Sequence, residues 1–220
     1  MERSSILTTH LNEVVRIHAG RLLTRQQVKS LLDTIQTTDP VVIEELNSAQ
    51  VNLSQIQRVL RELLEARIPI RDLVPILEAI SERARLSNDP EGLLEAARVA
   101  VGPAISAQFI QDGKLPVFTL DALLEQHLID SLRPGEDGSV LNIDPQKAEQ
   151  ILSKIATKAE EAEQKGIRAA LVCSSRLRPA LQKLVQVTSP HLGVLSITEL
   201  GPQVQPNRIG VIEIDNPAIV

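Results

Sequence analysis

The residues best suited to chemistry lie in the segment Leu171–Pro179, where Cys173 ends an apolar run and Arg178 follows five residues later. A cysteine between a buried strand and a helix N-terminus can be held as a thiolate by the helix dipole and by nearby guanidinium groups. The Cys-x4-Arg spacing is that of sulfurtransferase loops, and it is one residue shorter than the Cys-x5-Arg of thiol phosphatases. A Cys173-dependent sulfurtransferase or thiol phosphatase is therefore one hypothesis.

The same segment also has a purely structural interpretation. No glycine lies between Cys173 and Arg178, so the backbone N–H groups lack the freedom to fold around an anion. Cysteine is a common buried strand residue. Ser174 or Ser175 is a suitable N-cap, and Pro179 fits the first turn of a helix. We favour this interpretation and expect no catalytic residue.

The remaining polar residues specify no metal or cofactor site. His127 and His191 are isolated, and His10 and His18 would lie about 12 Å apart on one helix, too far for a single metal ion. The acidic segment Glu160–Glu163 has lysines at helical spacing, which i, i+4 pairing explains. A phosphate-cradling glycine loop is absent from the sequence. We therefore expect no cofactor, no metal and no small-molecule substrate.

The composition disfavours several classes of function. Of the 220 residues, 43% are hydrophobic, yet there is no Trp or Tyr and there are only two Phe, so the core must be aliphatic. The chain lacks aromatic platforms for bases, and its net charge of −5 does not suit a phosphate backbone, so nucleic acid is not an expected partner. With one cysteine and no run of 18 apolar residues, we expect a soluble chain in a reducing cytosol.

The first half of the chain has the pattern of consecutive amphipathic helices. Apolar residues recur at helical spacing from Thr9 to Leu23, behind Thr8 or Thr9 as the N-cap. A Gly102-Pro103 pair is expected to close the last helix of this half. Between these limits, further helices are predicted at Arg25–Ile35, Val42–Leu46, Asn52–Ala66, Asp72–Arg85 and Asp89–Val101.

After Asp112-Gly113 short β-branched runs alternate with helical segments. The predicted strands are Pro116–Phe118, Val140–Ile143, Arg168–Cys173, Val194–Ile197 and Ile209–Ile214. The predicted helices are Asp121–Leu132, Asp144–Lys165 and Ser175–Gln186, with Arg133–Gly138 as a loop. Together these patterns predict a mixed α+β fold, in which an N-terminal all-helical subdomain is followed by a small α/β layer domain.

Several stretches resemble the cytosolic C-terminal region of the flagellar and type III secretion export-gate protein family. The helical block that runs from Val-Leu-Arg-Glu-Leu-Leu into Ile-Pro-Ile-Arg-Asp-Leu is long and specific. The stretches that carry the resemblance are Thr9–Val15, Arg25–Asp33, Val59–Leu64, Ile68–Leu73, Ile76–Ile80, Leu171–Pro179 and Val194–Leu200. The resemblance covers almost the whole chain, which looks like the last third of the family's full length, and Leu171–Pro179 looks more like the flagellar pattern.

The resemblance implies a protein-binding and ring-assembly module rather than an enzyme. The family's cytosolic part has four subdomains and forms a nonameric ring on the cytoplasmic side of the bacterial inner membrane. There it receives export chaperone–substrate complexes, meets soluble export ATPase components and helps to switch the order of export. On that map, residues 1–23 would be a remnant helix of a preceding subdomain, 24–105 the helical subdomain and 106–220 the C-terminal α/β subdomain.

One functional residue is carried over by the resemblance. The family's chaperone-docking pocket includes a Thr that matches Thr9, although a plain N-cap role fits Thr9 equally well. Because the rest of that pocket belongs to subdomains outside this chain, we expect the chain alone to bind chaperones weakly or not at all. Pro75, which stands where the family usually has a good helix former, and the scarcity of aromatics depart from the family pattern. Two alternatives stay open: the Cys173 enzyme and an inactive scaffold fragment.

Overall fold

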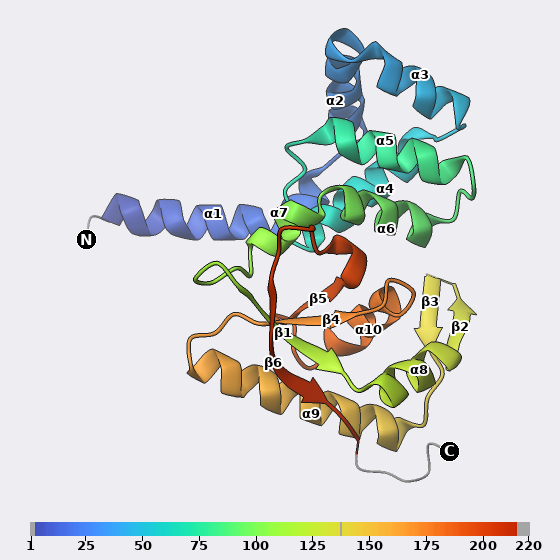
Figure 1. Ribbon diagram of the computed structural model, residues 1–220. Coiled ribbons are helices and arrows are strands. Elements are labelled where there is room, and N and C mark those ends of the chain that lie inside the picture. Colours follow the sequence, from blue (N-terminus) through green and yellow to red (C-terminus); the bar gives the residue numbers. More distant parts are fainter. Residues whose placement is uncertain (1–2, 137, 215–220) are drawn as a thin grey trace. The chain divides into compact units, whose positions relative to one another are not determined.

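The computed structural model describes residues 3–136 and 138–214, and the chain divides into two compact units, residues 1–104 and 105–220. The first unit is helical, and the second combines helices with a parallel sheet (Figure 1). The predicted mixed fold class is therefore confirmed.

The helical unit consists of amphipathic helices joined by short connections. They are α1 (Arg3–Leu22), α2 (Arg25–Thr38), α3 (Pro40–Ser48), α4 (Leu53–Glu65), α5 (Leu73–Ala84) and α6 (Pro90–Ala100), and α7 (Gly102–Ala107) follows. Capping boxes start two of them, because Thr24 pairs reciprocally with Gln27 at α2 and Asn52 with Gln55 at α4. These local signals explain why both helices begin at the expected places.

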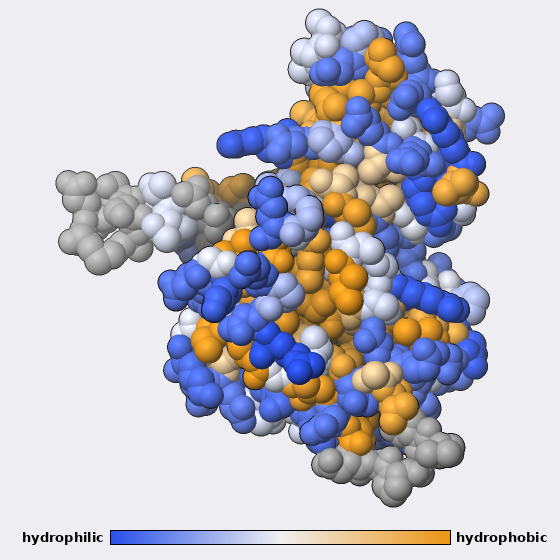
Figure 2. Space-filling view, viewed as in Figure 1, coloured by the Kyte–Doolittle hydropathy of each residue, from blue (hydrophilic) through white to orange (hydrophobic). Residues whose placement is uncertain are grey.

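The core of the helical unit is built around α4. One face of that helix buries Ile56, Val59, Leu60 and Leu63 completely or nearly so. The opposite face carries the Arg58–Glu62 ion pair at 2.8 Å, in the i, i+4 arrangement. Helix α4 contacts α1, α2 and α6, while α5 packs against α6. Other apolar residues remain exposed among polar ones, and such a mixed surface is visible in Figure 2.

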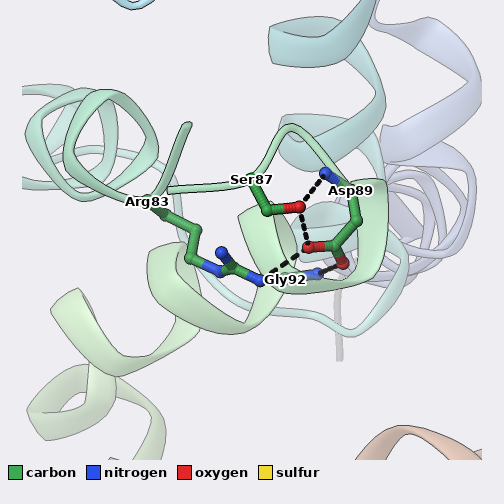
Figure 3. A network of polar contacts seen from close by, with 4 residues as sticks. All are labelled: Arg83, Ser87, Asp89 and Gly92. Atoms are coloured by element: carbon green, nitrogen blue, oxygen red, sulfur yellow. Dashed lines mark hydrogen bonds and ion pairs between the residues drawn. The ribbon is translucent and has the colours of Figure 1, made fainter. Parts of the chain in front are cut away.

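A polar network fixes the turn between α5 and α6 (Figure 3). Asp89 accepts a hydrogen bond from the Gly92 N–H at 2.6 Å and therefore caps α6, as the sequence predicts. The other carboxylate oxygen of Asp89 lies 2.6 Å from Nη2 of Arg83 and accepts a hydrogen bond from Ser87 at 3.0 Å. A single carboxylate thus joins the end of α5 to the start of α6.

Three predictions for the helical unit are wrong in detail. Helix α1 begins at Arg3, so Thr9 lies inside the helix and neither Thr8 nor Thr9 is its N-cap. The predicted short turn Val42–Leu46 is the full helix α3, started by Pro40. Asp72 precedes α5 but makes no side-chain capping hydrogen bond. Helix α6 ends at Ala100, with Val101 as its C-cap, so the helix closes just before Gly102-Pro103 as expected, and α7 begins at Gly102.

The second unit is organised around a four-stranded parallel sheet. Its strands are β1 (Leu115–Leu120), β4 (Ala170–Cys173), β5 (Gly193–Ser196) and β6 (Pro206–Ile212), in the spatial order β5-β4-β1-β6. Phe118 lies beside Leu171 of β4 and beside Gly210 of β6, which fixes the register around the central strand. Helices lie in the connections from β1 to β4 and from β4 to β5, whereas a short 3-10 helix and a loop lead from β5 to β6.

One face of the sheet packs against three helices, α8 (Ala122–Asp130), α9 (Pro145–Gln164) and α10 (Arg178–Val185). The core there is aliphatic apart from Phe118 and includes Leu128, Ile155, Leu171 and Leu181. At the edge strand, Gly193 leaves room for an aromatic ring, because a β-carbon on it would come within van der Waals overlap of the Phe109 side chain. The close approach of Phe109 to β5 therefore requires a residue without a side chain at position 193.

Three predictions for the α/β unit also need correction. The predicted loop Arg133–Gly138 contains a strand, because β2 (Leu132–Gly135) pairs with β3 (Gly138–Leu141) in an antiparallel hairpin. Helix α10 starts at Arg178, after a turn whose Leu177 and Arg178 N–H groups both donate to the Ser174 carbonyl. Neither Ser174 nor Ser175 is therefore its N-cap. Residues 197–199 form a short 3-10 helix rather than the end of a strand.

Candidate partner-binding surface

Thr9 lies in the interior of α1 and is exposed. In a helix of 3.6 residues per turn, Gly20 lies about three turns further on and within about 20° of Thr9 around the axis. The exposed apolar residues of α1 form a different stripe, roughly opposite Thr9. The helix therefore presents two distinct faces, one with Thr9 and one with aliphatic side chains.

The apolar stripe of α1 consists of large side chains left in contact with solvent. Leu11 is 62% exposed, Val15 47% and Leu22 54%, and Val14 belongs to the same stripe. Aliphatic side chains at consecutive turns of one helix face are typical of a surface that packs against another polypeptide. Among the described side chains of α1, this stripe is the main exposed apolar surface.

A groove between α1 and α2 continues this apolar surface. Its volume is about 600 Å³, and its lining is aliphatic on the α1 side and mostly uncharged polar on the α2 side. The lining residues are Val15, Ala19, Leu22, Leu23, Gln26, Gln27, Ser30, Leu31 and Thr34. A groove without a charged residue suits an apolar protein segment better than an ionic ligand.

The C-terminal end of α1 rests on one stripe of α4. A β-carbon on Gly20 would lie 2.6 Å from Cγ of Glu65 and 3.0 Å from the backbone oxygen of Arg61. The side chain of Gln57 donates a hydrogen bond of 2.9 Å from Nε2 to the Leu23 carbonyl. Gln57, Arg61 and Glu65 succeed one another at i, i+4 and i+8, so they line one side of α4.

Cys173 has the environment of a core residue. It is 1% exposed, belongs to the apolar core of the sheet, and its Sγ lies 3.9 Å from the Leu195 carbonyl oxygen. The N-terminus of α10 lies at Arg178, five residues later, so the helix dipole does not act at the thiol. Burial of this kind is typical of inert structural thiols rather than nucleophiles.

A carboxylate of the chain itself binds the backbone of the loop after Cys173. Glu125 of α8 accepts a hydrogen bond from the Ser174 N–H at 2.6 Å, in the place where a bound anion would meet the backbone. Further on, Ser175 and Thr198 share a hydrogen bond of 2.8 Å between their hydroxyl groups. Both contacts tie the loop to neighbouring elements, so the geometry supports the structural interpretation.

Within residues 3–136 and 138–214, no group of three or more His, Cys, Asp or Glu side chains is placed to hold a metal ion. His10 and His18 are exposed on α1, His127 lies in α8 and His191 is exposed beyond α10. The predicted acidic segment Glu160–Glu163 lies on α9, with its three glutamates exposed. The structure thus does not bring these residues together. In the same part of the chain, none of the helices has the length and apolar character needed to span a membrane.

Comparison with known proteins agrees with this architecture. The model of the FHIPEP family matches residues 1–205, and the chain therefore belongs to the FHIPEP family. Among curated proteins, the flagellar biosynthesis protein FlhA of Bacillus subtilis (strain 168) is 33% identical over 97% of this chain. FlhA of Escherichia coli (strain K12) is 34% identical over 91%. The family thus functions in flagellar biosynthesis, and the chain spans about a third of the length of these relatives (32% and 28%).

Solved structures of type III secretion proteins share the fold. Nonameric EPEC SctV-C superposes with a TM-score of 0.82 at 25% identity, covering 94% of this chain and 62% of the other. The CdsV protein of Chlamydia pneumoniae gives a TM-score of 0.85 at 24% identity, covering 94% and 60%. A further structure shows CdsV of that organism in complex with CdsO, at 23% identity with a TM-score of 0.84, covering 97% and 63%. The family link therefore extends from flagellar biosynthesis to type III secretion.

The assignment of Thr9 to a docking site stays a prediction, and sequence reasoning did not identify Gly20 or the groove beside α1. Gly20 in a helical stretch is a detectable signal, because glycine is costly inside a helix and often marks a close approach. The partner of that approach, the α4 stripe with Gln57, could not be inferred, since it depends on how two helices pack. The groove between α1 and α2 escaped detection for the same reason.

Proposed function

We propose that the chain is a protein-binding and ring-assembly module of a flagellar type III protein export gate, in which α1 helps to dock export chaperone–substrate complexes. In the longer protein it would lie on the cytoplasmic side of the inner membrane. The observation that carries this proposal is the combination of family membership with an exposed Thr9 on α1. The mechanism is recognition between surfaces, without a catalytic step.

The flagellar assignment is supported by the pattern of similarity. The FlhA relatives of Bacillus subtilis and Escherichia coli are 33% and 34% identical to this chain, whereas SctV-C is 25% identical. Ring assembly is supported by SctV-C and by the EscV cytosolic domain, both of which are nonameric in their solved structures. The complex of CdsV with CdsO supports a further role in binding another protein, and soluble export ATPase components are the partners expected in that role.

The two faces of α1 suit two different contacts. The apolar stripe with Leu11, Val15 and Leu22 would pack against a preceding subdomain of the longer protein, since aliphatic surface of this kind is stabilised by burial. The face with Thr9 would remain available for chaperone–substrate complexes. Movement between subdomains would then alter the docking surface and contribute to switching the order of export.

Calorimetry with two forms of the protein tests the docking proposal. The 220-residue chain is compared with a chimera in which it replaces the matching region of Bacillus subtilis FlhA. The probe is a purified flagellar chaperone–substrate complex from that bacterium. The chimera is expected to bind at least about tenfold more tightly than the chain alone, a difference of about 1.4 kcal/mol, because it completes the pocket.

A Thr9→Ala substitution in the chimera should weaken binding about fivefold, since one hydroxyl contact contributes about 1 kcal/mol. Thr157→Ala, which removes an exposed threonine from α9, is the matched control and should leave binding unchanged. Equal and tight binding by the isolated chain would refute the proposal that the pocket is shared with other subdomains. A chimera that folds but does not bind would refute the docking role itself and favour an inactive scaffold.

No observation in the structure favours the alternative of a Cys173-dependent enzyme. Its thiol is buried, its loop is occupied by Glu125, and the helix that would stabilise a thiolate begins at Arg178. Under the enzyme hypothesis Cys173→Ser would abolish an activity, whereas under the present proposal it leaves partner binding intact.

A further inference from the structure

The direction in which α1 leaves the helical unit is set at its last turn. Gly20 is buried against α4, while Thr9, eleven residues earlier, is exposed. At about 1.5 Å per residue, the two positions are separated by about 16 Å along the helix axis. A small change in the angle at which α1 meets α4 near Gly20 therefore produces a larger displacement of Thr9.

The contact at Gly20 leaves little room for any side chain. A β-carbon there would overlap Cγ of Glu65, and it would also meet Cγ of Arg61 at 3.1 Å and the Arg61 backbone oxygen at 3.0 Å. The Glu65 side chain can turn away, but the Arg61 carbonyl belongs to the α4 backbone and is fixed. Helices approach this closely only where one of them carries a very small residue.

A second contact holds the end of α1 against the same side of α4. Gln57 lies one turn before Arg61 on α4 and donates its hydrogen bond to the Leu23 carbonyl, just after α1 ends. Directly beyond, the reciprocal hydrogen bonds of Thr24 and Gln27 start α2. The end of α1 is thus held from the side by Gly20 and from its C-terminus by Gln57.

We propose that Gly20 is a positioning residue for the docking face of α1, which it orients by allowing α1 to rest directly on the Gln57–Arg61–Glu65 stripe of α4. This inference rests on the proposed docking function of Thr9. It adds that Gly20 determines the position of Thr9 relative to α4. A larger side chain at position 20 lifts the last turn of α1 from α4 and tilts the helix. A tilt of about 15° moves Thr9 by about 4 Å.

Distance measurement by double electron–electron resonance tests the orienting role of Gly20 without any binding partner. Spin labels are attached at His10→Cys in α1 and Lys29→Cys in α2, both exposed positions, in a Cys173→Ala background. Gly20→Gln introduces a long, uncharged, good helix former and should shift the distance distribution by about 3–4 Å or broaden it by that amount. Arg21→Gln, the same new residue at the adjacent exposed position, should leave the distribution unchanged.

Two further variants keep the test decisive if Gly20→Gln destabilises the fold. Gly20→Ala should give a distribution much closer to that of the unsubstituted chain than Gly20→Gln does, because Glu65 can turn away and the tight contact with Arg61 requires only a small shift of α1. Gln57→Ala leaves the Gly20 contact intact but removes the second one, so it should broaden the distribution. If both Gly20→Gln and Gln57→Ala retain the original distribution, the inference is overturned.

The functional consequence is measured with the chimera and the chaperone–substrate probe described above. Gly20→Gln should weaken binding at least about fivefold, comparable to Thr9→Ala, while Gly20→Ala and Arg21→Gln bind normally. A shifted distance with unchanged affinity would contradict a positioning role. Absence of binding by the unsubstituted chimera would refute the docking function, whereas the distances would still decide whether Gly20 orients α1.

Discussion

Thr9 and Gly20 lie on the same side of α1, about three turns apart, and Gly20 is packed closely against α4. The exposed end of this side carries Thr9, which we propose for chaperone docking, and the buried end carries the close contact at Gly20 that we propose to orient the helix. The aliphatic residues Leu11, Val15 and Leu22 lie on the other side of the helix. One helix thereby separates a candidate docking face from a candidate packing face.

The Asp89 network should be a local source of stability for the helical unit. Asp89→Ala removes both the cap of α6 at Gly92 and the contact with Arg83, and it should lower the free energy of unfolding by about 1–2 kcal/mol. Asp89→Asn keeps a capping oxygen and should lose less, because a half-exposed ion pair contributes only about 0–1 kcal/mol. Urea denaturation followed by circular dichroism measures both. Equal losses in the two variants would show that the ion pair, rather than the cap, dominates.

The end of α3 offers a stabilising substitution. Gln50 has a φ of +57°, in the left-handed region that favours glycine, and its N–H donates to the Asn47 carbonyl. Gln50→Gly should raise the free energy of unfolding by up to about 1 kcal/mol. Gln36→Gly is the matched control in the interior of α2, where the same change should cost about 0.5–1 kcal/mol. Destabilisation by both variants to the same extent would contradict the assignment of Gln50 as the left-handed residue that follows the C-cap Ala49 of α3.

The thiol of Cys173 should be inert in the folded protein. Its 1% exposure and its place in the sheet core mean that a thiol reagent reaches it only through opening of the structure. Reaction with dithionitrobenzoate should therefore be at least about 100-fold slower in the native protein than in denaturant. A native rate equal to that of the denatured chain would revive the enzyme hypothesis, as would faster reaction at low pH than a normal thiol shows.

Local signals in the sequence determine much of this fold. The Asn52–Gln55 capping box begins α4, Asp89 caps α6, and Gly166, with a φ of +70°, follows the end of α9 as expected. Asp121 likewise caps α8, because its carboxylate accepts hydrogen bonds from the N–H groups of Leu123 and Leu124. These features rely on residues only a few positions apart, so they can be inferred without knowing the tertiary structure.

Features that depend on distant segments could not be predicted. The β5-β4-β1-β6 order joins strands that are far apart in the chain, and no local pattern specifies it. The β2 strand was missed because Pro134-Gly135 is typical of a loop, whereas pairing with β3 makes it a hairpin. At the candidate site, Thr9 stays a prediction from the resemblance; its place inside α1 follows from the start of that helix at Arg3, and the close contact of Gly20 follows only from how α1 meets α4.

The most direct test of the account is a residue-resolved titration of the chain by nuclear magnetic resonance. The isotopically labelled 220-residue chain is titrated with unlabelled flagellar chaperone–substrate complex from Bacillus subtilis, under conditions that detect weak binding. The account predicts amide shifts centred on Thr9 and its neighbours in α1, reduced by Thr9→Ala and unaffected by Thr157→Ala. Shifts confined to the α/β unit, or shifts in α1 that are the same in Thr9→Ala, would contradict the central claim that this helix carries the docking face.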